Sequence, residues 1–285
     1  MGVLVLCSAG GSPGVTTTAV GLALAWPRPV LLIEADPTGA SGVLPGFLQG
    51  QQAPSRSVID LAIAQQQGHL GQTLLATALP LGESTRATFI PAVKSHRQAA
   101  AMTSVWEPLA DELLGLDRAG LDVLVDAGRL GLEWFPAPLL TRATVNLLVA
   151  RCTLPAVATA RVWAPWLAEL SQQSAIDTGL CLIGAGQPYP AAEVGRYLKL
   201  RPLVTLPEDA TGARVFSAGA APPRRRLARS PLAHALRSEA ASLAKRVADA
   251  ADALVTAHPA PAPRSAADPV AGPAEHVRTA VRGHA

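Results

Sequence analysis

Short apolar runs alternate with longer segments of helical periodicity along this chain of 285 residues. The runs are continuously apolar and rich in β-branched residues, as in strands that are buried on both faces. They cover residues 2–7, 30–34, 88–92, 121–126, 145–150, 180–184 and 203–206. Helical segments lie between them, at about 15–26, 57–66, 97–115, 155–173 and 191–198. This alternation predicts an α/β fold, a doubly wound and mainly parallel sheet flanked by helices.

A last helix carries its own start signal. Ser230 can cap it, and Pro231 stands at its first position, where a missing N–H costs nothing. One apolar stripe follows, made of Leu232, Leu236, Leu243, Val247 and Leu254. Beyond it the sequence is rich in proline and alanine and poor in large apolar groups. We therefore expect one domain over residues 1–256 and a disordered tail over 257–285, with mobile loops at 40–56 and 65–85.

Composition narrows the class of protein. Hydrophobic residues make up 49% of the chain, yet no stretch offers the roughly eighteen uncharged apolar residues of a membrane span. The first residues lack the basic start of a signal peptide. The three cysteines, Cys7, Cys152 and Cys181, lie in or beside apolar runs, which predicts reduced core thiols and a cytoplasmic protein.

A glycine-rich turn, AGGSPGVTT at residues 9–17, follows the first apolar run. Glycines let successive N–H groups point at one anion, and the start of a helix behind them adds its positive end. Thr16 stands where a phosphate loop places its magnesium-ligating hydroxyl, and Thr17 is placed to touch a phosphate. The residues expected to bind phosphate are Gly10, Gly11, Ser12, Pro13, Gly14, Val15, Thr16 and Thr17. Taken alone, the stretch also fits a plain Gly/Pro turn.

Two aspartates follow later apolar runs. Asp36 comes just after the second run, where it could hold a water on magnesium or orient an attacking water. Asp126 closes the fourth, a common way to hold magnesium through a water, and Gly128 lets a backbone N–H approach a terminal phosphate. Each aspartate alone fits a turn. Since the loops after parallel strands meet at one edge of a sheet, the glycine turn and both aspartates together favour a nucleotide site, with Thr16, Asp36 and Asp126 at the metal.

The motifs resemble those of the MinD/ParA-like P-loop ATPases, which carry a deviant Walker A loop. The stretch VLLIEADPTGAS is similar to the second motif of that family, with Glu34 in place of its first aspartate, and VLVDAGRLG is similar to the Walker B region. The late segment LVTLPEDATGARVFSAG is similar to the part that closes over the base, around Pro207 and Asp209. The resemblance implies ATP or ADP with Mg²⁺, Asp36 in catalysis, and a homodimer.

Departures from the family pattern change this expectation. Gly10 replaces the signature lysine, which the family uses across its dimer, and Val15 replaces the lysine that neutralises the phosphates. Losing one charge-assisted contact to phosphate costs roughly 1.5–3 kcal/mol. Arg129 is placed to restore part of the charge, and Gln187 stands where the family has a base-reading asparagine. We expect weak nucleotide binding, slow or absent hydrolysis, and a homodimer that forms without nucleotide.

Several functions stay open at this stage. Eroded loops of this kind resemble those of TadZ/CpaE-type members, which implies a protein that positions a pilus or secretion assembly. A ParA-type partition ATPase is the second reading, with DNA bound through the arginines Arg224, Arg225, Arg226 and Arg229. A solvated linker is slightly favoured over DNA binding for this stretch, because no aromatic residues lie among the arginines. A pseudo-ATPase scaffold is the third. The last residues lack the apolar face of a membrane-docking helix, so membrane binding is not expected.

Overall fold

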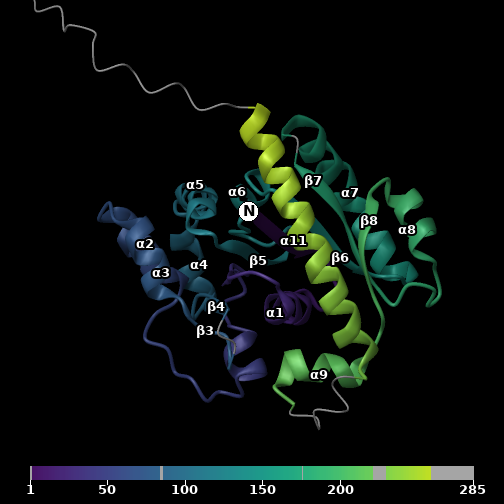
Figure 1. The fold of residues 1–285 in the computed structure, drawn as a ribbon, viewed down its shortest axis with the longest axis horizontal. Helices are drawn as coiled ribbons and strands as arrows, with labels where there is room; N and C mark the ends of the chain where they lie inside the picture. The colour runs from purple at the N-terminus through teal and green to yellow at the C-terminus, as the bar shows by residue number, and fades with distance from the viewer. Residues whose placement is uncertain (1, 84–85, 175, 221–228, 258–285) are drawn as a thin grey trace, which may run out of the picture.

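An eight-stranded sheet runs through the centre of the molecule (Figure 1). The computed structural model describes residues 2–83, 86–174, 176–220 and 229–257. The strand order is β3-β4-β2-β5-β1-β6-β7-β8, and every neighbouring pair is parallel except β3 with β4. The strands are β1 (Val3–Ser8), β2 (Val30–Glu34), β3 (Leu79–Pro80), β4 (Ala87–Ile90), β5 (Asp122–Arg129), β6 (Val145–Arg151), β7 (Asp177–Ile183) and β8 (Arg201–Leu206). The predicted mainly parallel α/β sheet is confirmed, and each of the seven apolar runs contributes a strand.

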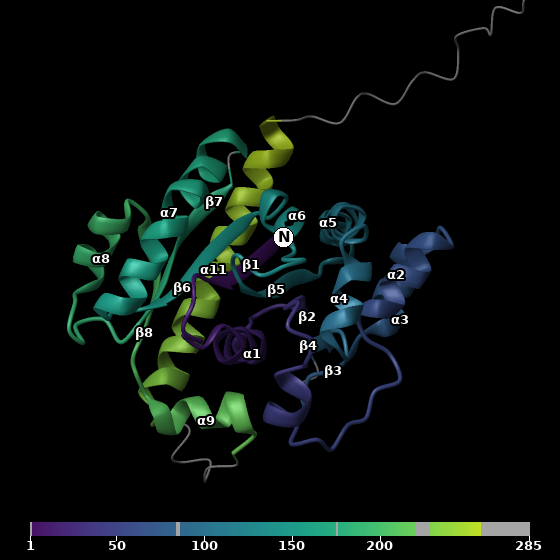
Figure 2. The ribbon, with the colours of Figure 1, turned by 180° about the vertical axis from the view of Figure 1, so that it is seen from behind.

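Helices cover both faces of the sheet, because side chains of each strand point alternately to the two sides. Val3, Val5 and Cys7 belong to one apolar core, and Leu4 and Leu6 belong to the other. The first core is covered by α2 (Val58–Gln66), α3 (Leu70–Thr77), α4 (His96–Met102), α5 (Trp106–Gly115), α6 (Ala137–Thr141), α7 (Leu154–Ser174) and α8 (Ala191–Leu198). The second is covered by α1 (Val15–Ala25), α9 (Ala210–Ala218) and α11 (Pro231–Ala257). Figures 1 and 2 show α11 and α7 on opposite faces.

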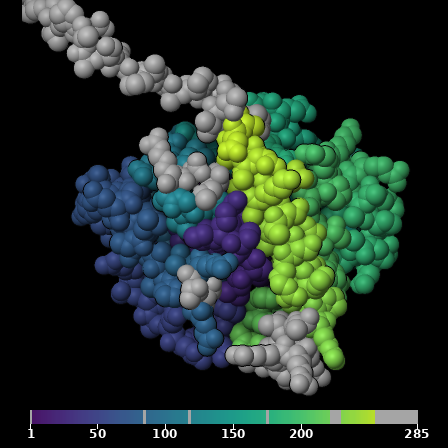
Figure 3. All heavy atoms as spheres, viewed as in Figure 1, coloured from purple at the N-terminus to yellow at the C-terminus, as the bar shows by residue number. Residues whose placement is uncertain are grey.

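The long helix α11 closes the second core, and Figure 3 shows it crossing that face of the molecule. Four residues of its predicted stripe, Leu232, Leu236, Leu243 and Val247, are buried. Leu236 packs on α1 at Gly21, where a Cβ would lie 2.5 Å from a Leu236 methyl carbon. The tail is predicted from residue 257, but α11 includes Ala257, and residues 258–285 lie outside the described residues.

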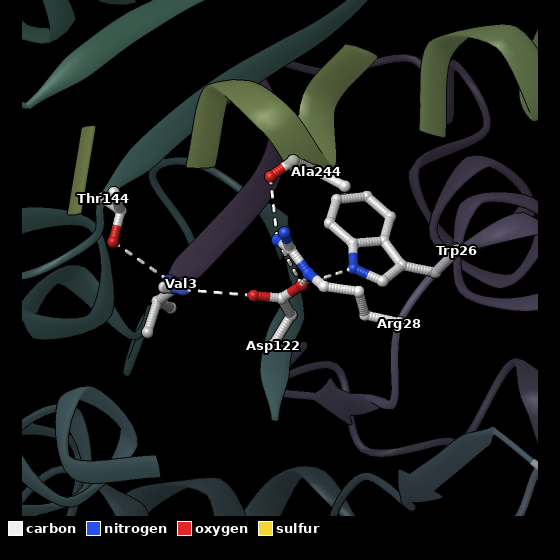
Figure 4. Close-up of polar contacts among 7 residues, drawn as sticks. Val3, Trp26, Arg28, Asp122, Thr144 and Ala244 are labelled. Carbon is white, nitrogen blue, oxygen red and sulfur yellow. Dashed lines mark hydrogen bonds and ion pairs between the residues drawn. The ribbon is translucent and has the colours of Figure 1, made fainter. Parts of the chain in front are cut away.

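A buried polar cluster joins α11 to the amino-terminal edge of the sheet (Figure 4). The Asp122 carboxylate, on β5, accepts hydrogen bonds from Trp26 Nε1 (2.7 Å) and Arg28 Nε (2.8 Å). Gly2 N–H donates to the same carboxylate at 3.2 Å, and Arg28 Nη2 donates to the Ala244 carbonyl of α11 at 2.8 Å. Two side chains, Asp122 and Arg28, therefore tie together the residue before β1, β5, the α1–β2 connection and α11, at the edge opposite the carboxyl ends of the strands.

Some predicted boundaries are wrong. The loop at 40–56 contains a turn of π-helix, η1 (Val43–Phe47), and the stretch 65–85 contains α3 and β3, since Leu70 and Leu74 bury against the first core. The helix expected at 97–115 is two helices, α4 and α5, followed by a short 3₁₀ turn, η2 (Leu116–Ala119). Strand β5 does not end at Asp126 but continues to Arg129, paired with Ser8 of β1.

The three cysteines lie in the core, as their apolar neighbours predict. Cys7, Cys152 and Cys181 are buried free thiols. Among the residues that the structure describes, no helix combines the length and the apolar character that crossing a membrane requires.

Candidate nucleotide-binding site

The glycine loop wraps the start of α1. Gly11, Ser12 and Gly14 all adopt positive φ angles, of +73°, +45° and +107°. Glycine reaches these angles without strain, whereas the same conformation costs a serine free energy. Helix α1 begins at Val15, and its first backbone bond runs from Thr18 N–H to the Gly14 carbonyl at 2.9 Å. A loop of this shape in front of a helix N-terminus suits an anion.

Three loops meet beside this turn at the carboxyl edge of the sheet, as the order of the motifs predicts. They enclose a hollow of about 320 Å³. The loop after β1 contributes most of the lining, the loop after β2 contributes Asp36, and β5 contributes Asp126, Gly128 and Arg129. Adjacent strands explain the convergence, because Asp126 is in register with both Glu34 of β2 and Leu6 of β1. The full lining is Ser8, Gly11, Ser12, Gly14, Val15, Thr16, Thr17, Asp36, Asp126, Gly128 and Arg129.

Asp126 and Thr16 are joined at the base of this first hollow. Thr16 Oγ1 donates to Asp126 Oδ2 at 2.5 Å, and Gly128 N–H donates to Oδ1 at 3.0 Å. The pKa of Asp126 is raised to about 7: burial raises it most, the nearby Glu34 and Asp36 carboxylates also raise it, and the two hydrogen bonds lower it. A hydroxyl and a carboxylate are the oxygen ligands that Mg²⁺ prefers, and a bound cation favours the ionised form of Asp126. The donor set therefore fits magnesium.

Asp36 is held against β5. Its carboxylate accepts the Thr38 N–H at 2.8 Å, which fixes the turn after β2. A Cβ on Gly128 would lie 2.4 Å from Asp36 Cγ, and Gly128 itself has a φ of +69°. Only glycine allows this close approach, so the pairing of Asp36 with the backbone of Gly128 brings a second carboxylate to the first hollow.

A second hollow, of about 220 Å³, lies on the other side of the loop. It shares Ser12, Gly14 and Thr17 with the first, so the two flank one turn. Its walls are mostly apolar, as a nucleotide base requires. The remaining lining residues are Pro13, Thr18, Arg151, Ile183, Leu206, Pro207, Glu208, Asp209, Ala210, Ala213, Leu232 and Leu236.

Comparison with known proteins gives structural relatives alone. No protein-family description matches the sequence, and no curated protein matches it. The septum-site-determining protein MinD from Pyrococcus horikoshii, solved with Mg-ADP, superposes with a TM-score of 0.66 at 18% identity, over 87% of this chain and 98% of MinD. A ParA-family ATPase from Chlorobium tepidum gives 0.66 at 15% identity, over 84% and 98%. MinD from Aquifex aeolicus, in complex with MinC, gives 0.63 at 17%, over 86% and 96%.

The chain has the MinD/ParA P-loop fold. At these identities the likeness shows the fold alone, and it spans nearly the whole length of each relative.

Glu34 has a role in this MinD/ParA fold that the sequence did not reveal. Its buried carboxylate accepts hydrogen bonds from Ser41 Oγ (2.5 Å) and from the N–H groups of Gly42 (2.8 Å), Val43 (3.1 Å) and Ala92 (3.4 Å). Burial raises the pKa of Glu34, and these hydrogen bonds oppose the rise. The segment that it holds packs on the loop helix, since a Cβ on Gly42 would lie 2.9 Å from Thr16 Cγ2. Glu34 positions the wall around Thr16.

Both lysine positions of the MinD/ParA pattern lack a charge. Val15 is 7% exposed and packs in the second core, so its side chain offers a phosphate nothing. A Cβ on Gly10 would lie 3.1 Å from Thr159 Cγ2 of α7, a tight approach. Arg129 is exposed at the first hollow, and within the described ranges its guanidinium has no hydrogen-bond or ion-pair partner. It is therefore available to an anion.

Pro207, Asp209 and Gln187 are expected near the base, for which the second hollow is the candidate. Pro207 and Asp209 both line it, but the Asp209 carboxylate caps α9 by accepting Gly212 N–H (2.8 Å) and also accepts Ser230 Oγ–H (2.7 Å). These bonds hold the pKa of Asp209 below its ordinary value. Gln187 is exposed and lies outside the lining of both hollows, and its part in reading the base stays a prediction. Arg151 and Glu208, which the sequence did not single out, stand at this wall instead.

The arginine cluster is only partly visible. Arg224, Arg225 and Arg226 lie outside the described residues, and Arg229 is exposed just before α11.

Proposed function

We propose that this chain is a nucleotide-binding positioning protein of the MinD/ParA type, with weak binding of Mg-ATP and Mg-ADP and little or no hydrolysis. The observation that carries the proposal is the Thr16–Asp126 hydrogen bond at the start of α1, inside a hollow that also holds Asp36. The fold supports nucleotide binding, because a relative with the same fold was solved with Mg-ADP. The positioning role rests on the same likeness to MinD and ParA proteins.

In this proposal the metal end of the site keeps its oxygen donors. Thr16 and Asp126 would hold Mg²⁺, Asp126 through a water, and Asp36 would hold a second water or orient the attacking one. When bound, the ion supplies positive charge to the β- and γ-phosphates. The hollow that holds these three oxygen donors also reaches Gly11, Ser12 and Gly14, whose backbone would cradle the phosphate chain.

The phosphate end is depleted of charge, which is why we propose weak binding. Val15 and Gly10 stand at the two lysine positions, so the site has neither lysine. The buried valine side chain cannot stabilise the negative charge that develops on a transferred phosphoryl group. Arg129 is the described side chain of the first hollow that carries positive charge. We assign Arg129 a compensating contact to the terminal phosphate. This contact is weaker than that of the missing lysine, because Arg129 lies at the end of β5 and its side chain is exposed.

We extend the proposal to assembly and place. A homodimer that forms without nucleotide follows from Gly10, because the lysine that gates the family dimer is absent. A protein cargo such as a pilus or secretion component is the partner that we favour, and MinD from Aquifex aeolicus offers a parallel in its complex with MinC. Buried free thiols at all three cysteines fit the reducing cytoplasm. DNA binding through Arg224–Arg229 is the alternative partner chemistry.

A pseudo-ATPase scaffold without nucleotide is a second candidate, which the burial of Val15 favours. Titration calorimetry with ADP, with and without Mg²⁺, separates the two. Weak saturable binding that requires Mg²⁺ and is lost in Thr16→Ala supports the proposed function, with Thr141→Ala, an exposed threonine of α6, as the matched control. Absence of binding at millimolar Mg-ADP in a folded protein favours the scaffold.

A further inference from the structure

An ion pair spans the ends of β6 and β8 at the rim of the second hollow. Arg151 is the last residue of β6, Glu208 follows β8 by two residues, and Arg151 Nη1 donates to Glu208 Oε1. Strand β7 lies between them, and its end is followed by Gly184, where a Cβ would lie 3.2 Å from Glu208 Oε2. The pair therefore closes over a position that is kept free of a side chain.

Arg151 and Arg129 lie on opposite sides of the glycine loop, each in one of the two hollows. The second hollow, which it lines, shares Ser12, Gly14 and Thr17 with the first. Of the described residues that line either hollow, Arg129 and Arg151 are the cationic ones, against the carboxylates of Asp36, Asp126, Glu208 and Asp209. A polyphosphate on this loop, with valine and glycine at the lysine positions, must take its positive partners from these two arginines, the metal and backbone N–H groups.

The two acidic residues of the second hollow are not equivalent. Asp209 is engaged by the N–H of Gly212 and the hydroxyl of Ser230, which hold two helices. For Glu208 the described structure shows one side-chain contact, the pair with Arg151. Both members of that pair are well exposed, at 40% and 44% of their side chains, so the pair contributes little to stability and separates readily.

We propose that Arg151 is a phosphate-binding residue that replaces part of the missing lysine charge, and that Glu208 is its internal competitor. This inference rests on the proposed function. When a nucleotide enters, the guanidinium exchanges the Glu208 carboxylate for a phosphate oxygen next to the ribose, because Arg151 lies on the wall where the apolar base pocket meets the loop. A guanidinium can form two parallel hydrogen bonds to a phosphate. The exposed pair of Arg151 with Glu208 has one contact, to a single carboxylate oxygen, and is therefore the weaker interaction.

The competitor role makes the two substitutions act in opposite directions. Mg-ADP is titrated into the wild type, Arg151→Gln, Glu208→Gln and the double variant. Arg161→Gln is the matched control, because Arg161 is an exposed arginine of α7 that lies over the Tyr197 ring. We expect Arg151→Gln to raise Kd by about tenfold, since one charge-assisted phosphate contact is lost. Glu208→Gln should lower Kd severalfold because it frees Arg151, the double variant should match Arg151→Gln, and the control should leave Kd unchanged.

Other outcomes overturn the inference while leaving the proposed function standing. Binding by Arg151→Gln at wild-type strength shows that the arginine does not touch the ligand. Weaker binding by Glu208→Gln shows that Glu208 is itself a ligand or that the pair is needed intact. Thermal unfolding without ligand checks that each variant folds, and Arg151→Lys, which keeps the charge without the fork, should give an intermediate Kd. If the wild type binds no Mg-ADP, the proposed function fails first, and this inference fails with it.

Discussion

Thr16, in the first turn of α1, donates its hydroxyl proton to the Asp126 carboxylate on β5 over 2.5 Å, across 110 residues of sequence. This contact joins a glycine loop to a carboxylate within β5, an arrangement that suits a magnesium nucleotide. The Asp126 side chain that it holds is buried, with the residue only 2% exposed. The first prediction follows from that burial.

Asp126→Asn should remove a pH dependence of stability. Burial raises the pKa of Asp126 from 3.8 to about 7, so its contribution to ligand-free stability is fully present below the unfolded pKa and is lost as pH rises through about 7. A folded pKa that lies one pH unit above the unfolded pKa corresponds to about 1.4 kcal/mol. Urea unfolding of the wild type should show stability falling between about pH 4 and about pH 7 relative to Asp126→Asn. Parallel curves for the two proteins would contradict the assigned burial effect.

The same carboxyl sets the pH dependence of ligand binding. A metal favours the ionised form of its carboxylate ligand, so Mg-ADP should bind more tightly as pH rises from about 6 to about 8. Titration calorimetry in buffers of different ionisation enthalpy should detect proton release on binding. Affinity that is flat across this range would mean that Asp126 does not respond to the bound metal.

Val15→Lys should strengthen nucleotide binding. The stem of a lysine can occupy the buried place of Val15 while its ammonium reaches the first hollow, which Val15 lines. We expect Kd for Mg-ADP to fall by about tenfold, the effect of one charge-assisted contact. Val162→Lys, on an exposed α7 position, adds the same charge elsewhere and should change nothing. A folded Val15→Lys protein with unchanged Kd would show that the backbone cradle is not in place.

Gly128→Ala should disturb the contact between β5 and the Asp36 turn. The new Cβ would lie 2.4 Å from Asp36 Cγ at a residue with φ of +69°. We expect a loss of about 1–3 kcal/mol in the free energy of unfolding and weaker Mg-ADP binding. Gly115→Ala, where a Cβ meets nothing within 4 Å, is the matched control and should be neutral. Equal unfolding free energies for the two variants would sink this account of the turn.

Ser230→Ala should loosen the junction between α9 and α11. The serine hydroxyl donates to Asp209 at 2.7 Å and accepts the Ala233 N–H at 3.2 Å. Loss of a helix cap lowers the free energy of unfolding by about 0.5–2 kcal/mol. Ser217→Ala, at an exposed serine, is the control and should lower it less. Because hydrogen bonds lower the pKa of Asp209, its share of stability is present above the unfolded pKa and is lost as pH falls through the folded pKa. The gap between wild type and Ser230→Ala in unfolding free energy should therefore shrink in acid.

Light scattering of the purified chain tests the proposed assembly. Since Gly10 cannot supply the gating lysine, we expect a homodimer with and without Mg-ATP, held by an interface of about 1,200 Å² or more. A monomer that dimerises only on addition of Mg-ATP would restore a nucleotide switch.

The parallel sheet and the convergence of the main site were predictable because both follow from local signals. Continuous apolar runs identify buried parallel strands, and loops that follow such strands share one edge, which brings Thr16, Asp36 and Asp126 together. Short elements such as α3 and β3 were missed because their burial depends on neighbours distant in sequence.

Contacts between residues distant in sequence could not be predicted either. Arg151 and Glu208 are 57 residues apart and meet only because β6, β7 and β8 lie side by side. The place of Gln187 outside both hollows depends on the path of the loop after β7, which periodicity does not give. Glu34 was recognised as a substitution, but its hydrogen bonds to the 41–43 segment require the fold.

A crystal structure grown with Mg-ADP at saturating concentration tests the central claim most directly. The account predicts the diphosphate on the loop of residues 10–17, Mg²⁺ beside Thr16 with Asp126 holding one of its waters, and the base in the hollow lined by Ile183 and Pro207. Nucleotide bound elsewhere, or an empty loop in a crystal saturated with Mg-ADP, would contradict it.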